Sequence, residues 1–177
     1  MHFIILVDTH CHINSEEFSH NLLEVLSRAL HSGVRRILVV GADIESSRKA
    51  ILLTRQNSGV QLNASVGIHP HDSVDLTEMS KRAVLQMAKD RAVLAIGETG
   101  LDYHYEHSPR KEQKESFLWH LKLAHEVRKP VIVHVREAYP DTIDMLSFLK
   151  DPVRGVIHCF SGTWEDARKF LDMGFFL

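Results

Sequence analysis

Short apolar runs alternate with amphipathic segments along nearly the whole chain, and this alternation most constrains its fold. The runs are FIILV, RRILVVGA, QLNASVG, AVLAIGE, PVIVHV and GVIHCF. Runs this rich in Val, Ile and Leu are typical of strands whose two faces are both buried in a parallel sheet. The segments between them predict helices over residues 16–31, 45–56, 76–90, 110–128, 140–149 and 164–173. We therefore expect an α/β protein with helices flanking a parallel sheet.

A doubly wound open sheet and a β/α barrel both satisfy this alternation, and the strand ends distinguish them. Barrels take functional residues from the carboxyl ends of several strands, whereas a dinucleotide-binding sheet concentrates its chemistry in a glycine-rich first turn. No G-x-G-x-x-G follows the first run. Polar residues instead follow one run after another: Asp8, His10 and His12; Asp43; His69 and His71; Glu98 and Asp102; His134 and Arg136; and His158. We predict a TIM-type (β/α)₈ barrel, incomplete here with six to seven β/α units, as a single domain over residues 1–177.

Composition narrows the functional classes. The chain has 21 basic and 23 acidic residues, so it lacks the basic surface of a protein that grips long duplex DNA. Its 13 histidines are a more informative feature, because imidazole is the commonest metal ligand. The two cysteines form no disulfide framework, and no apolar stretch reaches the length of a membrane span. These features predict a cytoplasmic location with no membrane partner.

The first run leads into DTHCHIN, which holds two histidines with one residue between them. On an extended backbone, His10 and His12 point to the same face, and Cys11 points to the other. Two imidazoles in this arrangement can occupy neighbouring positions around one divalent ion. Glu98 ends the run AVLAIGE, where a carboxylate is costly to bury unless it is paired or bound to metal. A salt bridge is the simpler interpretation of Glu98; the functional one is that its two oxygens bridge two metals.

Two later strands repeat the pattern. His134 lies within VIVHVRE, and Arg136 shares its face of the strand. An isolated histidine in an apolar strand is usually a core residue, but a guanidinium two residues later is suited to bidentate capture of phosphate. His158 in GVIHCFSG follows the same pattern on the next strand. His69, Asp102 and Tyr103 are candidates for contacting substrate or for supporting the ligands, as is His71.

Five segments together carry a resemblance to a known family: DTHCHIN, VGIHPHD, IGETGLDYHY, PVIVHVREA and IHCFSG. In this order and spacing they resemble the TatD family of metal-dependent deoxyribonucleases, in the amidohydrolase-like barrel superfamily. The resemblance implies a two-metal barrel enzyme acting on DNA as a 3′–5′ exonuclease or a repair-type endonuclease. It implies His10, His12 and Glu98 around one ion, and Glu98, His134 and His158 around the second. Glu98 and Arg136 would be the catalytic groups, with zinc, magnesium or manganese as the metal.

The family pattern continues beyond the motifs found here, with an eighth strand whose end supplies an aspartate within E-T-D. A complete barrel has about 250 residues, whereas the sequence has 177 and ends in GFFL, which predicts the start of a seventh strand. We therefore expect an incomplete barrel without strand eight, and a first metal that is weakly held. Open sheet edges recruit partners, so we also expect self-association.

Three functions stay open on these residues. The first is the metal-dependent DNase, with activity impaired if the barrel is incomplete. The second is a lactonase or amidase of the same superfamily, although such relatives often place a carboxylated lysine where this chain has Glu98. The third is a barrel remnant that binds metal without turnover.

Overall fold

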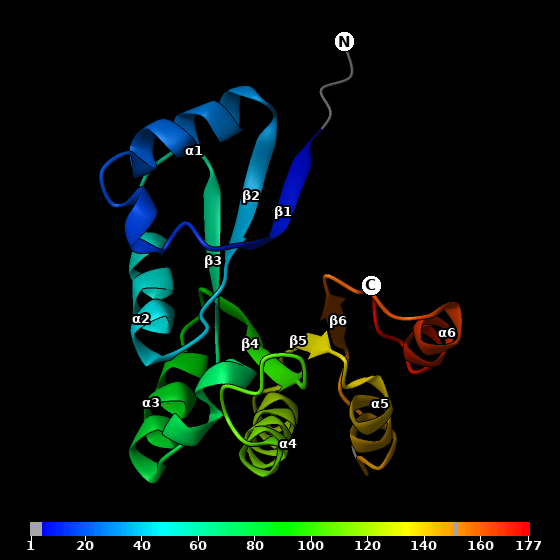
Figure 1. Ribbon diagram of the computed structural model, residues 1–177. Helices are drawn as coiled ribbons and strands as arrows, with labels where there is room; N and C mark the ends of the chain where they lie inside the picture. The colour runs from blue at the N-terminus through cyan, green and yellow to red at the C-terminus, as the bar shows by residue number, and fades with distance from the viewer. Residues whose placement is uncertain (1–4, 151) are drawn as a thin grey trace.

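Six parallel strands form one curved sheet in the order β1 to β6, with each strand hydrogen-bonded to the next along the chain (Figure 1). The computed structural model describes residues 5–150 and 152–177. The strands are β1 (Leu6–Cys11), β2 (Val34–Val39), β3 (Gln61–Val66), β4 (Val93–Asp102), β5 (Val131–Arg136) and β6 (Gly155–His158). The helices are α1 (Leu22–His31), α2 (Ile44–Leu53), α3 (Glu78–Ala88), α4 (Arg110–Val127), α5 (Tyr139–Ser147) and α6 (Trp164–Asp172). Two 3₁₀ helices, η1 (Glu16–Phe18) and η2 (Pro70–Asp75), complete the described elements.

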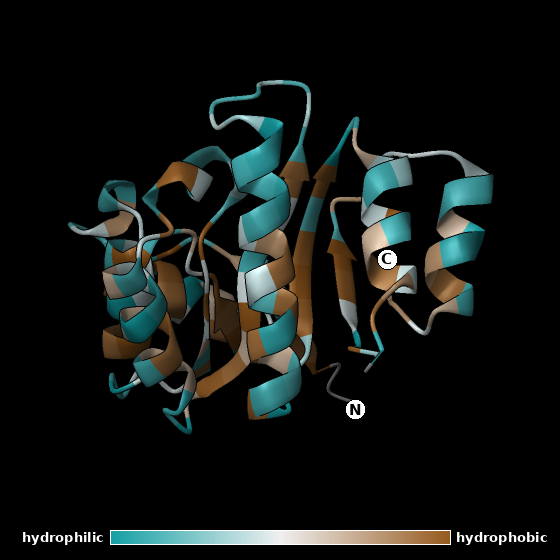
Figure 2. Cartoon of the chain, turned by 90° about the horizontal axis from the view of Figure 1, so that it is seen from below, coloured by the Kyte–Doolittle hydropathy of each residue, from teal (hydrophilic) through white to brown (hydrophobic). Residues whose placement is uncertain are grey.

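The helices lie on the outer face of the curved sheet, and their apolar sides face the strands (Figure 2). The larger core cluster packs between helices and sheet and includes the fully buried Leu26, Phe117 and Phe170. A smaller cluster consists of Ala95 on β4, Ile132 on β5 and Val40 directly after β2. Side chains alternate between the two faces of a strand, so this second cluster occupies the concave side. The predicted (β/α)₈-type barrel, incomplete here, is confirmed.

Side-chain caps explain where several helices begin. Asp43 accepts a hydrogen bond from the backbone N–H of Ser46 and so caps α2, which is the role the structure gives this strand-end carboxylate. Thr77 caps α3 and Thr163 caps α6 in the same way. Helix α4 ends where Arg128 takes a left-handed conformation. These caps satisfy N–H groups that a helix cannot pair internally.

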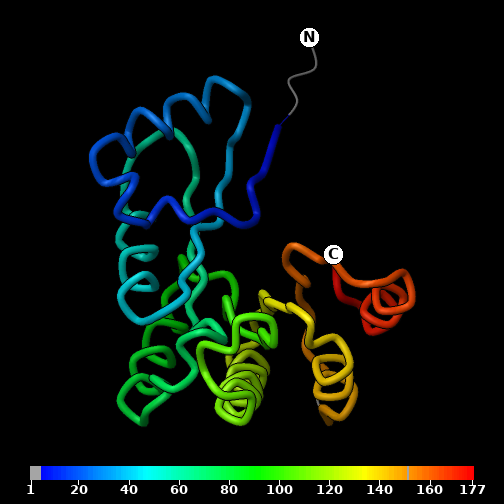
Figure 3. The backbone as a smooth tube through the Cα atoms, viewed as in Figure 1, coloured from blue at the N-terminus to red at the C-terminus, as the bar shows by residue number. Residues whose placement is uncertain are grey.

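Three sequence expectations differ in detail from the observed elements. The first strand was expected over FIILV, but residues 1–4 lie outside the described part and β1 runs on through Cys11, which places His10 inside the strand. The single helix expected over residues 16–31 is divided into η1 and α1, because the chain turns between them. The segment GFFL makes one isolated parallel bridge, from Phe176 to Val156, rather than a strand. Figure 3 traces this final segment back beside β6 after α6.

None of the helices in the described ranges 5–150 and 152–177 is long and apolar enough to cross a membrane.

Candidate metal centre

The register of the sheet brings the polar strand ends together. In the pairing of neighbouring strands, His134 on β5 lies beside Gly100 on β4 and beside His158 on β6. His10 comes from the end of β1, and His69 directly follows β3. Because the strands are parallel, their carboxyl ends meet at one mouth of the curved sheet. The polar residues at the strand ends therefore lie close together at this mouth.

Glu98 lies at the centre of the cluster, and its two carboxylate oxygens face different imidazoles. The Oε2 atom is 3.3 Å from His10 Nε2 and 3.8 Å from His12 Nε2. The Oε1 atom is 3.2 Å from His134 Nδ1 and 3.9 Å from His69 Nε2. Glu98 is only 4% exposed, so these side chains replace the water that a carboxylate requires.

The electrostatics of the site follow from these contacts. Burial opposes ionisation of Glu98, but hydrogen bonds with His10 and His134 hold the pKa of its carboxyl well below its usual range. Burial also opposes protonation of His134, yet its hydrogen bonds to Glu98 and Asp102 raise the pKa of this imidazole. Glu98 is therefore an anion at neutral pH.

Two glycines allow β4, which carries Glu98, to lie close to β5. Gly97 has φ of 134° and Gly100 has φ of 143°, a region that side chains rarely adopt. A Cβ atom at Gly97 would lie 2.5 Å from the carbonyl oxygen of Ile132, and one at Gly100 would meet the carbonyl of His134. Glycine at both positions therefore permits the close approach that places Glu98 against His134.

Among the residues that the structure describes, two groups of side chains could each hold a metal ion, and Glu98 belongs to both. One group is His10, Glu98 and His158, and the other is His69, Glu98 and His134; within each, the ligand atoms lie within 4.8 Å of one another. The resemblance implied a different division, with His12 beside His10 and His158 beside His134. The structure instead stacks the His158 ring on that of His10, with centroids 3.4 Å apart. How the ligands divide between ions stays a prediction.

Three of the imidazoles are in the neutral state that suits a divalent cation. Burial lowers the pKa of His12 and of His158, and lowers that of His69 to about 4. These rings are therefore neutral at pH 7, which is the form that donates a nitrogen lone pair to metal. His12 Nε2 also lies 3.1 Å from His10 Nε2, so the two nitrogens of the H-x-H pair are close together.

Asp102 forms a second, fully buried acidic centre beside the first. Its Oδ2 atom is 2.8 Å from His71 Nε2 and 3.1 Å from His134 Nε2. Its Oδ1 atom accepts the backbone N–H groups of His104 and Tyr105. Burial opposes ionisation, but these hydrogen bonds lower the pKa of Asp102 to about 2. A carboxylate that orients a ligating imidazole commonly strengthens metal binding.

The other two predicted residues have different surroundings. Arg136 is exposed at the end of β5, and its Cζ atom lies 4.7 Å from the centre of the Tyr105 ring. The Tyr103 hydroxyl donates to Asp141 at 2.5 Å, on α5. The Tyr103 hydroxyl is thus bound to the outer helix layer and not to Glu98.

Four residues have contacts that the sequence analysis did not predict. His69 was treated as a substrate contact or support, although its nitrogen belongs to a potential ligand group. His120 was not singled out, yet its Nε2 accepts the backbone N–H of Ile68, which immediately precedes His69. His107 and Tyr105 were not singled out either. The aromatic density of DYHYEH was the available signal for these last two.

Comparison with known proteins agrees with this geometry. The family model described as TatD related DNase matches residues 7–177. The chain is 39% identical over 177 residues to the uncharacterized metal-dependent hydrolase YabD of Bacillus subtilis, covering 98% of this chain and 68% of the relative. It is 35% identical over 173 residues to the 3′-5′ ssDNA/RNA exonuclease TatD of Cronobacter sakazakii, covering 97% and 65%.

A solved structure of a TatD homologue has the same fold. The TatD homologue YjjV of Escherichia coli superposes with a TM-score of 0.87 at 29% identity, covering 96% of this chain and 66% of that one. The chain thus spans about two thirds of the length of these relatives. With a matching family model over nearly its whole length and a relative at 39% identity, the chain belongs to the TatD-related DNase family of metal-dependent hydrolases.

Proposed function

We propose that this protein hydrolyses phosphodiester bonds in DNA with two divalent ions that share Glu98, removing nucleotides from single strands in the 3′–5′ direction or cutting at repair sites. One observation carries the proposal: each oxygen of the buried Glu98 faces its own group of imidazoles. A carboxylate can bridge two ions in this way, whereas an imidazole cannot. Two neighbouring ions would activate water and offset charge on the attacking and leaving oxygens.

The identity of the metal follows from the ligand types. Nitrogen-rich ligation favours zinc or another transition metal over magnesium, and manganese and magnesium remain candidates for turnover. His10 and His158 on one side, and His69 and His134 on the other, are the nitrogens proposed to hold the ions. Asp102, which contacts His134 Nε2, would fix the orientation of this ring.

Arg136 is proposed to hold the substrate phosphate. Its guanidinium is exposed, and the parallel pairing of β5 with β4 places it beside Asp102 in the strand register. A planar guanidinium binds two phosphate oxygens at once and thereby orients the bond to be cleaved. The near-neutral charge of the chain also suits binding of strand ends better than of long duplexes. The name of the Cronobacter relative supports single strands as substrates.

A cleavage assay with matched variants tests the proposal. Single-stranded DNA and RNA oligonucleotides labelled at either end are incubated with Mg²⁺, Mn²⁺ or Zn²⁺, beside Glu98→Gln. Glu45→Gln is the control, because Glu45 is an exposed glutamate paired with Lys49 on α2. We expect metal-dependent loss of the 3′ label, abolished by Glu98→Gln and unchanged by Glu45→Gln.

Other results identify the alternatives. Metal binding without cleavage of any oligonucleotide would favour the inactive remnant, and hydrolysis of lactones or amides alone would favour the related amidohydrolase chemistry. Cleavage that persists in Glu98→Gln would contradict the assignment of the centre.

Self-association is a separate proposal. Among the described strands, β1 pairs with β2 alone, and Leu6 and Val7 on it are 46% and 54% exposed. Exposed apolar residues on an unpaired strand edge favour pairing with a second chain. Sedimentation velocity tests this, and a monomer across the micromolar range would contradict it. The cytoplasmic location stays a prediction.

A further inference from the structure

The segment that follows β4 displays aromatic rings beside the metal centre. The Tyr105 ring is 51% exposed, and the His107 ring is nearly parallel to it, at 4° with centroids 5.6 Å apart. Parallel rings in contact lie about 3.5 Å apart, so this separation means that the rings are laterally offset. Neither ring therefore covers the other. We refer to Tyr105, His107 and Arg136 together as the mouth platform, since the Arg136 guanidinium also contacts the Tyr105 ring.

The backbone under the mouth platform is held in place. Asp102 Oδ1 accepts the N–H groups of His104 at 3.0 Å and Tyr105 at 2.9 Å. The His104 ring lies 2.8 Å from a carboxylate oxygen of Glu137, just beyond β5. Little conformational entropy remains to be lost when a ligand settles on a ring positioned in this way.

A chain of direct contacts connects the mouth platform to the centre. The His71 ring lies 5.6 Å from the Tyr105 ring and 4.6 Å from that of His107, measured between centroids. His71 also bonds Asp102, which bonds His134 beside Glu98. A nucleotide on the mouth platform would therefore lie next to the phosphodiester that the centre acts on.

We infer that the mouth platform binds one nucleotide of a single-stranded nucleic acid, with a base stacked on Tyr105 and His107 and its phosphate on Arg136. This inference rests on the proposed nuclease function and adds the substrate contact. The mouth platform is accessible to a ligand, because Tyr105 is half exposed and lies beside the metal centre. Every base presents an aromatic face, so such a site accepts all four bases.

Binding of labelled oligonucleotides tests the inference. Fluorescence anisotropy of a short single-stranded DNA is compared with that of the same strand carrying abasic sites at its 3′ end, in EDTA and in Ca²⁺. Tyr105→Ala should weaken binding of the normal strand about tenfold, as expected for the loss of one stacked base. Tyr105→Trp should restore binding. The control is Phe148→Ala, which removes an aromatic ring that is 86% exposed next to α5 and away from the mouth.

The abasic strand separates stacking from a merely structural effect. It should bind the unaltered protein weakly and should not distinguish Tyr105→Ala from it. Equal affinity of Tyr105→Ala and the unaltered protein for the normal strand would overturn the inference while leaving the nuclease proposal intact. If the unaltered protein neither binds nor cleaves any nucleic acid, both proposals fail.

Discussion

The two ends of the sheet bury charge in opposite ways. At the amino-terminal end, the Lys129 ammonium donates to three backbone carbonyls, those of Ala88 at 2.6 Å, Asp90 at 3.0 Å and Val93 at 2.6 Å. At the carboxyl end, the charge of Glu98 is met by imidazoles, which can exchange a proton or a metal ion. Backbone carbonyls do not exchange a proton near neutral pH, and they are hard ligands that suit Ca²⁺ or Mg²⁺ rather than zinc.

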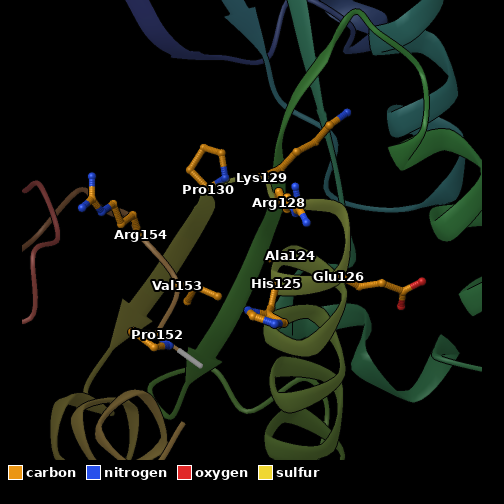
Figure 4. Close-up of a pocket in the computed structure, with 9 residues that line it drawn as sticks. All are labelled: Ala124, His125, Glu126, Arg128, Lys129, Pro130, Pro152, Val153 and Arg154. Atoms are coloured by element: carbon orange, nitrogen blue, oxygen red, sulfur yellow. The ribbon is translucent and has the colours of Figure 1, made fainter. Parts of the chain in front are cut away.

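The hollow at the amino-terminal end supports this contrast. It measures about 730 Å³ and is lined by residues at the end of α4 and before β6, including Arg128 and Arg154 (Figure 4). Its size alone would attract attention as a binding site, but the buried carboxylates and the clustered histidines all lie at the other end. Ligand chemistry, rather than cavity size, therefore indicates the carboxyl end of the sheet as the candidate functional end.

The largest expected effect comes from removing the shared carboxylate. Glu98→Gln keeps the shape but removes the negative charge that both groups of imidazoles face, so affinity for Zn²⁺ or Mn²⁺ should fall by more than about 100-fold. Isothermal titration calorimetry measures this. Lys129→Met at the opposite end should leave metal affinity unchanged, and a comparable loss in that variant would remove the distinction between the two ends.

A smaller loss is expected from the carboxylate behind the centre. Asp102→Asn retains hydrogen bonding but weakens the orientation of His71 and His134, so metal affinity should fall by about 10–100-fold. The same titration measures it, with Asp144→Asn, an exposed position on α5, as the control. Unchanged affinity in Asp102→Asn would show that Asp102 supports only the loop after β4.

At the amino-terminal end, the expected effect is on stability. Lys129→Met removes the ammonium donor from three carbonyls, of which that of Asp90 keeps the backbone N–H of Val93, and should lower the free energy of unfolding by about 2 kcal/mol. Urea denaturation followed by circular dichroism measures this change. A variant as stable as the unaltered protein would mean that water replaces the ammonium without cost.

The smallest predicted effect concerns His120, which joins α4 to the segment before His69. Burial lowers the pKa of this imidazole to about 4, below the ordinary 6.5 of the unfolded chain. Its stabilising contribution is therefore complete above pH 6.5 and is lost as the pH falls toward 4, because the unfolded state then binds more protons. Lowering the pH from 7.5 to 5.5 should therefore reduce the free energy of unfolding by about 1 kcal/mol through this one group.

Denaturation at several pH values, compared between the unaltered protein and His120→Gln, isolates that contribution. The difference between the two curves should shrink as the pH falls. Parallel curves would mean that His120 does not titrate on unfolding.

The fold was largely predictable because each strand is a continuous apolar run and each helix has an apolar face. The end of β4 was harder to predict. The segment GETGLD has the composition of a turn, but Gly97 and Gly100 allow the strand to continue to Asp102 against β5. Among the site residues, His10, Glu98 and His134 could be found from their strand-end positions. The candidate ligand groups include His69, which was not predicted as a ligand, and lack His12, which was. The position of His69 depends on the loop after β3, where the backbone N–H of Ile68 donates to His120, 52 residues away in the sequence. Local patterns carry no information about such a contact.

The central claim is that divalent ions bind at the mouth, around Glu98. Anomalous diffraction from crystals soaked in ZnCl₂ tests it most directly, because zinc positions appear independently of any assumed ligand. The account predicts zinc within about 2.0–2.2 Å of a Glu98 oxygen and of nitrogens from the surrounding histidines. Zinc found only in the hollow beside Arg128 and Arg154, or on surface histidines with none at Glu98, would contradict it.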